Sequence, residues 1–588
     1  MKILVFLLSC LCSCGVLYAA AGDLDSTFDG DGKVTTDFAA GADRVTGIVL
    51  QPDGKIVAVG RVEIGGSSDF GVARYNPDGS LDSGFGAGGK RNTDFGSGDI
   101  GEAVALQADG KIVVVGSTSA GTQGFAVARY LPNGNLDTSF SSDGKVTTDF
   151  SADTDSAKAV AIQPDGKIVV AGYAGNAGIS DVALVRYNAD GSLDTSFSFD
   201  GKIVLDFGPD SVATAVALQP DGRIVVAGNT YNPDDFAVAR YNPDGSPDTS
   251  FDSDGRLTTD FPAGLEYGNS VALQADGKII VGGGANPGST TDFALLRYNP
   301  DGSLDTTFNF DGKVSVDLGG NSDTFQSVVV QPDGKIVAAG YTQGGGVTDF
   351  AVVRFTSDGS LDTSFSTDGI VTTDFFTDND VAYGAAVQPD GKILAAGWAH
   401  IGTNREFALA RYEGDPLPAC VFCDDFEDGV LASDWTYVKP SWSESGGNLI
   451  ATPVKKAAAI ASPAFAGCSA CSFEASMMTS GGSGNRLWML AWYADKNNTL
   501  EILMKEESGK FILKQRAGGA VVAKTKGLIP LLPNVSYNVK VTFDGAAFTL
   551  FVNGNSIATL TAAAAPSVGT VGFQAKNTTA SFGHVLVE

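Results

Sequence analysis

The sequence predicts an all-β protein: a seven-bladed β-propeller followed by an antiparallel β-sandwich of the jelly-roll type. Three observations support this prediction: a block of residues recurs seven times, each repeat has four short strand-like segments, and 75 of the 588 residues are glycine. Glycine weakens helices and permits tight turns, and no part of the repeats keeps the 3.6-residue period of an amphipathic helix. A chain of this length is too long for one core, which indicates at least two domains.

The repeat defines the strands of the first domain. The block Gln-Pro-Asp-Gly-Lys-Ile-Val begins at Gln51 and returns with small changes, at intervals of 55 to 57 residues, at Gln107, Gln163, Gln219, Gln274, Gln331 and Gln388. In the second unit, residues 103–107, 111–116, 125–130 and 145–150 have the character of strands, and Asp109-Gly110 fits a hairpin turn. Four short antiparallel strands in each of seven consecutive units are typical of a β-propeller.

The phase of the repeat predicts how the ring closes. The chain begins with a segment of the fourth-strand type at residues 33–38, whereas the seventh unit ends after its third strand at residues 407–412. Pairing these two segments would complete the seventh blade and leave no exposed sheet edge at that seam. We therefore expect a propeller over residues 22–413 that is closed by its N-terminal strand.

Charged residues that occur in every unit are expected to be structural. Arg74 and its equivalents would pair with the acidic residue after the fourth strand, such as Asp94. The Asp-rich turns at residues 29–32 and 76–82 have two interpretations. Their oxygen atoms suit calcium, but they lack the full twelve-residue calcium loop, and aspartate in such turns commonly accepts hydrogen bonds from its own backbone. No other cofactor is indicated.

The repeated blocks resemble the bacterial delta-60 repeat family. The resemblance rests on Gln-Pro-Asp-Gly-Lys-Ile-Val, Arg-Tyr-Asn-Pro-Asp-Gly and Leu-Asp-Thr-Ser-Phe, and it covers about two thirds of the chain. It implies a β-propeller fold and an exported protein, and it implies no particular chemistry.

The N-terminus predicts export to the cell exterior or surface. An apolar run at residues 3–17 and the small residues Ala19-Ala20-Ala21 form a signal peptide, residues 1–21, with cleavage before Gly22. The leader contains three cysteines, and its segments 7–10 and 11–14 resemble lipoprotein cleavage boxes. A lipid anchor is therefore the alternative to release. No later run is long enough to span a membrane. The net charge of −29 disfavours binding to nucleic acids and anionic membrane surfaces.

The variable connections of the propeller contain the candidate ligand-binding residues. The segments between the second and third strands, and those between successive units, differ in length and content and should gather at one end of the ring. Aromatic rings beside carboxylates would suit sugar rings or peptides there, whereas loops that drift without selection are the structural alternative. The candidates are Tyr173, Tyr231, Tyr341 and Trp398.

Composition changes near Asp415, which predicts a linker at residues 414–423 and a second domain at residues 424–588. Asp544-Gly545 and Asn553-Gly554 separate strand-like runs as hairpin turns do. Two Cys-x-x-Cys pairs are expected to form disulfides in an exported protein, with three connectivities open, and a four-cysteine zinc site is the alternative. These cysteines are Cys420, Cys423, Cys468 and Cys471.

The order of acidic and strand-like motifs in the second domain resembles concanavalin A-like lectin and glucanase sandwiches. The motifs are those at residues 424–427, 537–541, 548–554 and 569–573. Members that cleave glycans use closely spaced acidic residues on one strand, and the corresponding candidate, residues 488–493, has none. The resemblance therefore implies a non-catalytic carbohydrate-binding module.

The leading interpretation is an exported, non-catalytic binding or scaffold protein that recognises a glycan or an extracellular protein. One alternative is a carbohydrate-active enzyme, either a lyase or a hydrolase, and another is a structural component of the cell surface. The chain has only two histidines, which disfavours a Ser-His-Asp arrangement.

Overall fold

The computed structural model describes residues 19–415, except residues 40, 121–122, 151–152, 209, 232, 262–263, 287–289 and 320–321, together with the strands between residues 422 and 587. The expected signal peptide up to residue 18, with its three cysteines, lies outside the described residues, as do Cys420 and Cys468. The regular elements in the described part are all β-strands. Among these residues no helix is long and apolar enough to cross a membrane.

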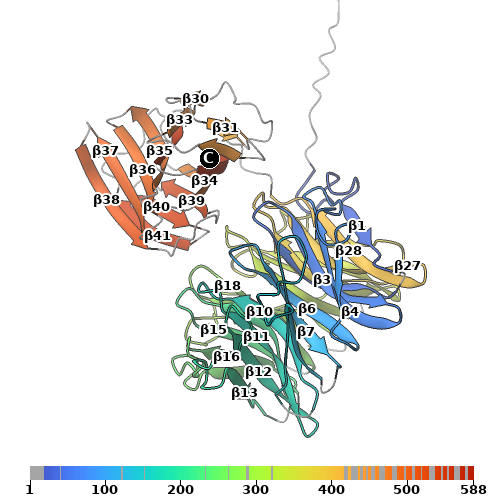
Figure 1. The fold of residues 1–588 in the computed structure, drawn as a ribbon. Helices are drawn as coiled ribbons and strands as arrows, with labels where there is room; N and C mark the ends of the chain where they lie inside the picture. The colour runs from blue at the N-terminus through green and yellow to red at the C-terminus, as the bar shows by residue number, and fades with distance from the viewer. Residues whose placement is uncertain are drawn as a thin grey trace, which may run out of the picture.

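Seven antiparallel sheets of four strands form the blades of a propeller (Figure 1). Blade 1 contains β2 (Arg44–Leu50), β3 (Ile56–Ile64), β4 (Ser67–Tyr75) and β5 (Lys90–Thr93). Blade 2 contains β6 (Asp99–Leu106), β7 (Ile112–Thr118), β8 (Gly124–Tyr130) and β9 (Lys145–Thr148). Blade 3 contains β10 (Ser156–Ile162), β11 (Ile168–Asn176), β12 (Ile179–Tyr187) and β13 (Lys202–Leu205).

The remaining four blades repeat this order of strands. Blade 4 contains β14 (Ser211–Leu218), β15 (Ile224–Thr230), β16 (Phe236–Tyr241) and β17 (Arg256–Thr259). Blade 5 contains β18 (Glu266–Leu273), β19 (Ile279–Ala285), β20 (Asp292–Tyr298) and β21 (Lys313–Val316). Blade 6 contains β22 (Asp323–Val330), β23 (Ile336–Gly344), β24 (Val347–Phe355) and β25 (Ile370–Thr373). Blade 7 contains β26 (Asp380–Val387), β27 (Ile393–Ile401), β28 (Asn404–Tyr412) and β1 (Lys33–Thr36).

The blades pack because their middle strands are apolar on both faces. Every residue of β8 is buried, for example, because neighbouring blades cover both of its sides. Between blades 1 and 2 the shared cluster includes Val57, Val59, Phe70, Ile112 and Val114. Comparable clusters join the other neighbouring blades. The result is a continuous apolar core with connections projecting from two ends.

We name these two ends of the ring by their connections. At the turn end lie the links from first to second strand and from third to fourth strand, which in blade 1 are residues 51–55 and 76–89. At the loop end lie the hairpin between the second and third strands and the link to the next blade, which in blade 1 are residues 65–66 and 94–98.

The N-terminal segment lies beside the C-terminal end of the repeat region. β1 pairs with β28 in antiparallel register, with Lys33 opposite Ala410 and Val34 opposite Leu409 (Figure 1, blue beside yellow). The carboxylate of Asp25 accepts hydrogen bonds from Arg411 Nε at 2.6 Å and Lys392 Nζ at 2.7 Å.

Ala21 also belongs to this seam. It is buried, and its carbonyl accepts the backbone N–H of Ser366 at 2.8 Å. In other blades the aspartate of the Asp-Gly turn provides this carbonyl, as Asp190 does for Ser141 at 2.9 Å. Ala21 is the last residue of the expected signal peptide, so cleavage before Gly22 would remove this contact.

Each buried arginine pairs with a different aspartate from the one expected. Arg74 Nε donates to Asp82 Oδ2 at 2.8 Å, and its Nη1 donates to the carbonyl of Pro132 in blade 2 at 2.5 Å. Asp94 lies at the opposite end of the blade, because Ala73 faces Lys90 and Phe70 faces Thr93 in the antiparallel pair β4–β5. The expected pairing of Arg74 with Asp94 is therefore wrong.

The same arginine–aspartate pair recurs in every blade. The equivalent pairs are Arg129–Asp137, Arg186–Asp194, Arg240–Asp248, Arg297–Asp305, Arg354–Asp362 and Arg411–Asp25. All these carboxylates lie at the turn end. The buried charges of that end are thus neutralised by side chains of the protein itself.

The strands after residue 422 form two further antiparallel sheets. One has the order β31 (Trp442–Glu444), β32 (Asn448–Ala451), β43 (Ala580–Val587), β34 (Cys471–Thr479), β39 (Tyr537–Phe543), β40 (Ala547–Val552) and β41 (Asn555–Thr561), with β29 (Phe422–Asp424) also paired to β43. The other has the order β30 (Trp435–Tyr437), β33 (Ala457–Ala461), β42 (Thr570–Lys576), β35 (Arg486–Asp495), β36 (Asn498–Lys505), β37 (Lys510–Ala517) and β38 (Ala520–Leu528).

Alternate residues of these sheets are buried, as expected for strands with one apolar face. Phe511 and Leu513 are buried in β37, and Val539 and Val541 are buried in β39. The jelly-roll arrangement and the likeness to concanavalin A-like proteins stay predictions.

The strand order restricts the disulfide connectivity. Cys423 faces Leu586 of β43, and Leu586 faces Glu474 of β34 on its other side. Cys471 lies in β34, so one strand separates it from Cys423. Two strand spacings amount to about 9–10 Å, which exceeds the Cα separation of about 7 Å that a disulfide can bridge. A bond between Cys423 and Cys471 is therefore disfavoured, and two connectivities remain.

Candidate functional site

The four aromatic residues singled out in the sequence lie toward the loop end of the propeller. Tyr231 directly follows β15, in a connection that varies between blades. Tyr173, Tyr341 and Trp398 lie within the long second strands β11, β23 and β27. These strands extend further than the sequence pattern indicates, so the three residues lie within inner strands near the hairpins and not at loop tips.

Two of the four candidates lie near a third tyrosine. Partial burial raises the pKa of Tyr267, and the nearby acidic groups of Asp234, Tyr231 and Tyr341 raise it further. Tyr231, Tyr267 and Tyr341 are all half-buried and come from blades 4, 5 and 6. We call these three residues the tyrosine cluster. It offers aromatic surface and hydroxyl groups beside the carboxylate of Asp234, which is the mixture that small polar ligands require.

Tyr173 and Trp398 have different surroundings. Tyr173 is half-buried between Ser156 and Val182 of its own blade 3. Trp398 is only 6% exposed, and the guanidinium of Arg405 lies over its ring at 4.2 Å. Trp398 therefore belongs to β27 and is covered by Arg405, whereas its sequence position indicated a variable connection; a ligand contact at Trp398 stays a prediction.

A polar ring lines the central channel. Each first strand has a β-bulge at the same place, which turns one extra side chain out of the regular pattern. The residues at these bulges are Thr46, Glu102, Lys158, Thr214, Asn269, Gln326 and Tyr383.

These side chains mostly bond to neighbouring blades. Lys158 Nζ donates to Glu102 Oε1 at 2.6 Å, Thr46 donates to the carbonyl of Gly101 at 2.9 Å, and Asn269 donates to the carbonyl of Phe325 at 2.8 Å. The channel cavity of about 220 Å³ is lined by residues of all seven first strands. Its polar groups are used within the ring, which indicates a structural role.

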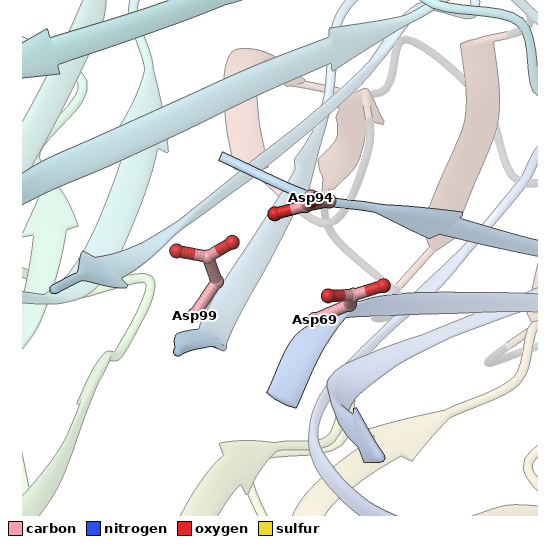
Figure 2. Close-up of side chains that lie close together, drawn as sticks. All are labelled: Asp69, Asp94 and Asp99. Atoms are coloured by element: carbon pink, nitrogen blue, oxygen red, sulfur yellow. The ribbon is translucent and has the colours of Figure 1, made fainter. Parts of the chain in front are cut away.

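Clusters of three acidic residues lie at the loop end, and the sequence pattern alone does not reveal them. Each cluster joins an acid of a third strand, the aspartate after the fourth strand and the acid that starts the next blade. Figure 2 shows Asp69, Asp94 and Asp99 facing one another in this way, and one carboxylate oxygen of each lies within 4.8 Å of the other two. The other clusters are Asp235–Asp260–Glu266, Asp292–Asp317–Asp323 and Asp349–Asp374–Asp380. We call the four clusters the acidic triads.

Burial and mutual repulsion disfavour the ionised state of these carboxyl groups. Burial raises the pKa of Asp99, and the neighbouring charges of Asp94 and Asp69 raise it further. Burial likewise raises the pKa of Glu266 to about 7, with contributions from Asp260 and Asp235. The pKa of Asp380 is raised to about 6, again chiefly by burial.

The Asp-Gly turns at the opposite end bind their own backbone. Asp78 Oδ1 accepts both the N–H of Ser80 at 3.0 Å and its hydroxyl at 2.6 Å. The same bonds recur between Asp190 and Ser192. These are the hydrogen bonds of a structural Asx turn. Calcium binding at these turns stays a prediction.

The turn end is less uniform than the repeat indicated. Phe199 and Phe310 are 98% and 93% exposed, at positions where other blades have residues such as Ser142 and Ser253. All four residues adopt positive φ, between 64° and 72°. Phe199 and Phe310 are therefore exposed aromatic residues of the turn end, and they can serve as controls for aromatic residues of the loop end in tests of ligand binding.

The geometry defines the repeat region as a seven-bladed β-propeller with acidic triads and a tyrosine cluster at its loop end. Seven segments match the model of a family described as a domain of unknown function (DUF5122) beta-propeller. The matched segments are residues 51–85, 107–140, 163–197, 219–251, 274–308, 331–365 and 388–415. No curated protein matches the chain.

Several solved structures show weak similarity. Carbohydrate binding module CBM66 from Bacillus subtilis is 17% identical, with 27% of this chain and 97% of that chain covered and a TM-score of 0.24. Xylan beta-1,4-xylosidase from Bacillus halodurans C-125 is 13% identical, with 82% and 97% covered and a TM-score of 0.27. The GH43 protein BlXynB from Bacillus licheniformis is 14% identical, with 73% and 96% covered and a TM-score of 0.24 or below. Similarities at this level support no inference about function.

Proposed function

We propose that this protein is an exported, non-catalytic binding protein whose propeller holds a glycan at the loop end. The observation that carries the proposal is the tyrosine cluster, because Tyr231 of blade 4, Tyr341 of blade 6 and the carboxylate of Asp234 all lie near Tyr267 of blade 5. Aromatic faces pack against the apolar faces of sugar rings, and hydroxyl and carboxylate groups accept or donate the hydrogen bonds that sugars require.

The sevenfold scaffold strengthens this assignment. A single asymmetric ligand requires a surface that differs from blade to blade. The tyrosine cluster is such a surface, because blades 4, 5 and 6 each contribute a different residue to it. Rigid strands on both sides hold these residues, so little ordering would accompany binding. An extracellular protein is the alternative ligand.

A carbohydrate-active enzyme is the second candidate function. The raised pKa of Glu266, about 7, is in the range that suits a general acid, and Asp260 and Asp235 lie beside it. Glu266 is only 1% exposed, however, so a substrate would not reach it without a rearrangement. This burial favours binding over hydrolysis. A purely structural role at the cell surface would require no ligand at all.

The test of glycan binding uses the full-length protein. A glycan array should identify a binding oligosaccharide, and Tyr231→Ala and Tyr341→Ala should each weaken its affinity about tenfold, because a well-placed aromatic contact is worth on the order of 1–1.5 kcal/mol. Melting temperatures should change little, because both rings are only half-buried. Titration calorimetry provides the affinities.

The matched controls are Phe199→Ser and Phe310→Ser at the turn end, which substitute the type of residue that other blades have there. These changes should leave the affinity unchanged. Binding that survives both tyrosine changes and is lost on the phenylalanine changes would assign the ligand to the turn end. Release of free sugar from the bound oligosaccharide would favour the enzyme. Trp398→Ala is unsuitable as a probe, because emptying a buried tryptophan site costs about 3–5 kcal/mol.

Export is part of this proposal and predicts oxidised cysteines. The signal-peptide pattern at the N-terminus directs the chain to a compartment in which disulfides persist. Mass spectrometry under non-reducing conditions should find no free thiol among the four cysteines of the mature chain: Cys420, Cys423, Cys468 and Cys471. Four alkylatable thiols together with one equivalent of zinc would contradict the prediction in favour of a metal site.

A further inference from the structure

The spacing of the acidic triads fits a single cation. Calcium is coordinated by oxygen at 2.3–2.6 Å, so two of its ligand atoms can lie at most about 5 Å apart. The nearest carboxylate oxygens of Asp69, Asp94 and Asp99 lie within 4.8 Å of one another, and they come from three separate segments of blades 1 and 2 (Figure 2). One ion placed among them could contact all three groups.

Buried oxygens without hydrogen-bond partners are an independent second observation. Asp99 is fully buried. Its Oδ2 accepts the N–H of Phe95 at 2.6 Å, and its Oδ1 makes no hydrogen bond of normal geometry, although the Thr118 hydroxyl lies near the carboxylate. Asp323 is 1% exposed and its Oδ1 also has no partner, while Glu266 is 1% exposed and has no partner apart from the backbone N–H of Phe261. A buried carboxylate oxygen without a partner is costly, so a missing ligand is the simplest explanation for three such groups at equivalent positions.

Buried carboxylates at the two ends of the ring differ in whether a basic side chain pairs with them. At the turn end every buried aspartate of the repeat has an arginine, as Asp137 has Arg129 at 2.9 Å. Around Asp69, Asp94 and Asp99, within the part of the chain that the structure describes, no basic side chain forms an ion pair with a carboxylate. Lys145 donates to the main-chain carbonyl of Asp94 at 3.0 Å and not to its carboxylate, and the Asn92 amide that donates to Asp69 at 2.8 Å is neutral. The negative charges of this triad therefore have no ion-pair partner among the described side chains.

We propose that Asp69, Asp94 and Asp99 bind a divalent cation of the calcium type, and that the three other acidic triads do the same. Oxygen-only ligands select hard cations over zinc or copper. In each triad the middle aspartate is exposed, so water can complete the coordination shell. Calcium tolerates such irregular shells of six to eight oxygens, whereas magnesium demands a regular octahedron. Each ion would tie one blade to the next at the loop end, whether or not a glycan binds.

The test begins with chelator-treated full-length protein titrated with calcium chloride and, separately, with magnesium chloride. Calorimetry should show saturable calcium binding with a dissociation constant on the order of 10⁻⁴–10⁻³ M, the range of extracellular calcium modules. Magnesium should bind more weakly. Calcium should also raise the melting temperature, because a ligand that binds only the folded state stabilises it.

The variants replace the exposed middle aspartate of each triad. Asp94→Asn should remove about one bound ion per chain, and the fourfold variant Asp94→Asn, Asp260→Asn, Asp317→Asn, Asp374→Asn should abolish both the binding and the thermal shift. Asparagine retains the side-chain oxygen that accepts the turn hydrogen bond, as Asp94 does from Gly96 N–H at 2.5 Å. The fold should therefore persist in these variants.

Asp149→Asn is the matched control. Asp149 occupies the equivalent position in blade 2, where Gly124 stands in place of the third carboxylate, so this change should leave the number of bound ions unaltered. Absence of calcium binding to the unmodified protein would overturn the proposal. So would binding that is undiminished in the fourfold variant, because the ions would then lie elsewhere, for example at the Asp-Gly turns.

Discussion

A variant without residues 22–38 should lose more than about 5 kcal/mol of unfolding free energy relative to the intact chain. The deletion removes β1 and leaves β28 as an exposed edge strand. It also removes Phe28, which is buried under the Arg411 guanidinium at 4.6 Å, and loss of a buried aromatic side chain alone costs about 3–5 kcal/mol. Without Asp25, Arg411 loses its carboxylate partner and Lys392 keeps only Glu413, and breaking the buried ion pair of Arg411 adds a similar cost.

Unfolding in urea measures this loss, and addition of the missing segment provides the control. A synthetic peptide of residues 22–38 should restore part of the stability of the shortened chain, because it can pair with β28 and supply Asp25. The same peptide with Asp25→Asn should restore less, since it cannot neutralise the buried charge of Arg411. A shortened chain that unfolds at the same urea concentration as the intact one would show that the N-terminal segment does not support the ring.

The sequence predicted the propeller well because its repeat reports strands and turns directly. Residues 125–130 were expected as a strand, and β8 spans Gly124–Tyr130. Local pattern is sufficient for such elements because alternation, β-branched residues and Asp-Gly turns all act within a few positions of one another. Seven copies of the pattern then specify the number of blades.

The partners of charged and aromatic residues were harder to predict, because they depend on strand direction and strand length. Arg74 was assigned to Asp94 on strand adjacency alone, although the two residues lie at opposite ends of an antiparallel pair. Trp398 was placed in a loop because variable residues follow it, yet β27 continues to Ile401 and Arg405 covers the ring. The residue type at one position predicts neither the length of its strand nor the direction in which that strand pairs.

The acidic triads were also hard to predict, because their members come from three separate segments of the chain. Asp69, Asp94 and Asp99 are separated along the chain, and Asp99 belongs to the next blade. The available signal was the recurrence of an acid after each fourth strand and at the start of many first strands. It became a candidate site only when the antiparallel pairing of the third and fourth strands brought the third-strand acid beside them, as β4 and β5 bring Asp69 beside Asp94.

The arginine–aspartate pairs of the turn end should contribute strongly to stability, and blade 4 offers an internal comparison. Asp248 is buried, its Oδ2 accepts Arg240 Nε at 2.7 Å, and its Oδ1 accepts the N–H of Ser250 at 3.1 Å. Asp248→Asn should destabilise the protein by about 3–5 kcal/mol, because Arg240 keeps its buried charge and loses its counter-charge. Asp221 contacts Arg223 at 2.8 Å but its side chain is 53% exposed, so Asp221→Asn should cost less than about 1 kcal/mol.

The pH dependence separates a charge effect from a packing effect. Against the opposing effect of burial, hydrogen bonds from Ser250 and the hydrogen bond and charge of Arg240 hold the pKa of Asp248 below its ordinary value. A carboxyl group with a lowered pKa in the folded state contributes stability above its unfolded pKa of about 3.9, and this contribution is lost as the pH falls toward the folded value. The difference in unfolding free energy between the unmodified chain and Asp248→Asn should therefore be full at pH 7 and should shrink below pH 4. A difference that stays constant down to pH 3 would mean that asparagine disrupts the packing around Phe251, and that the ion pair itself contributes little.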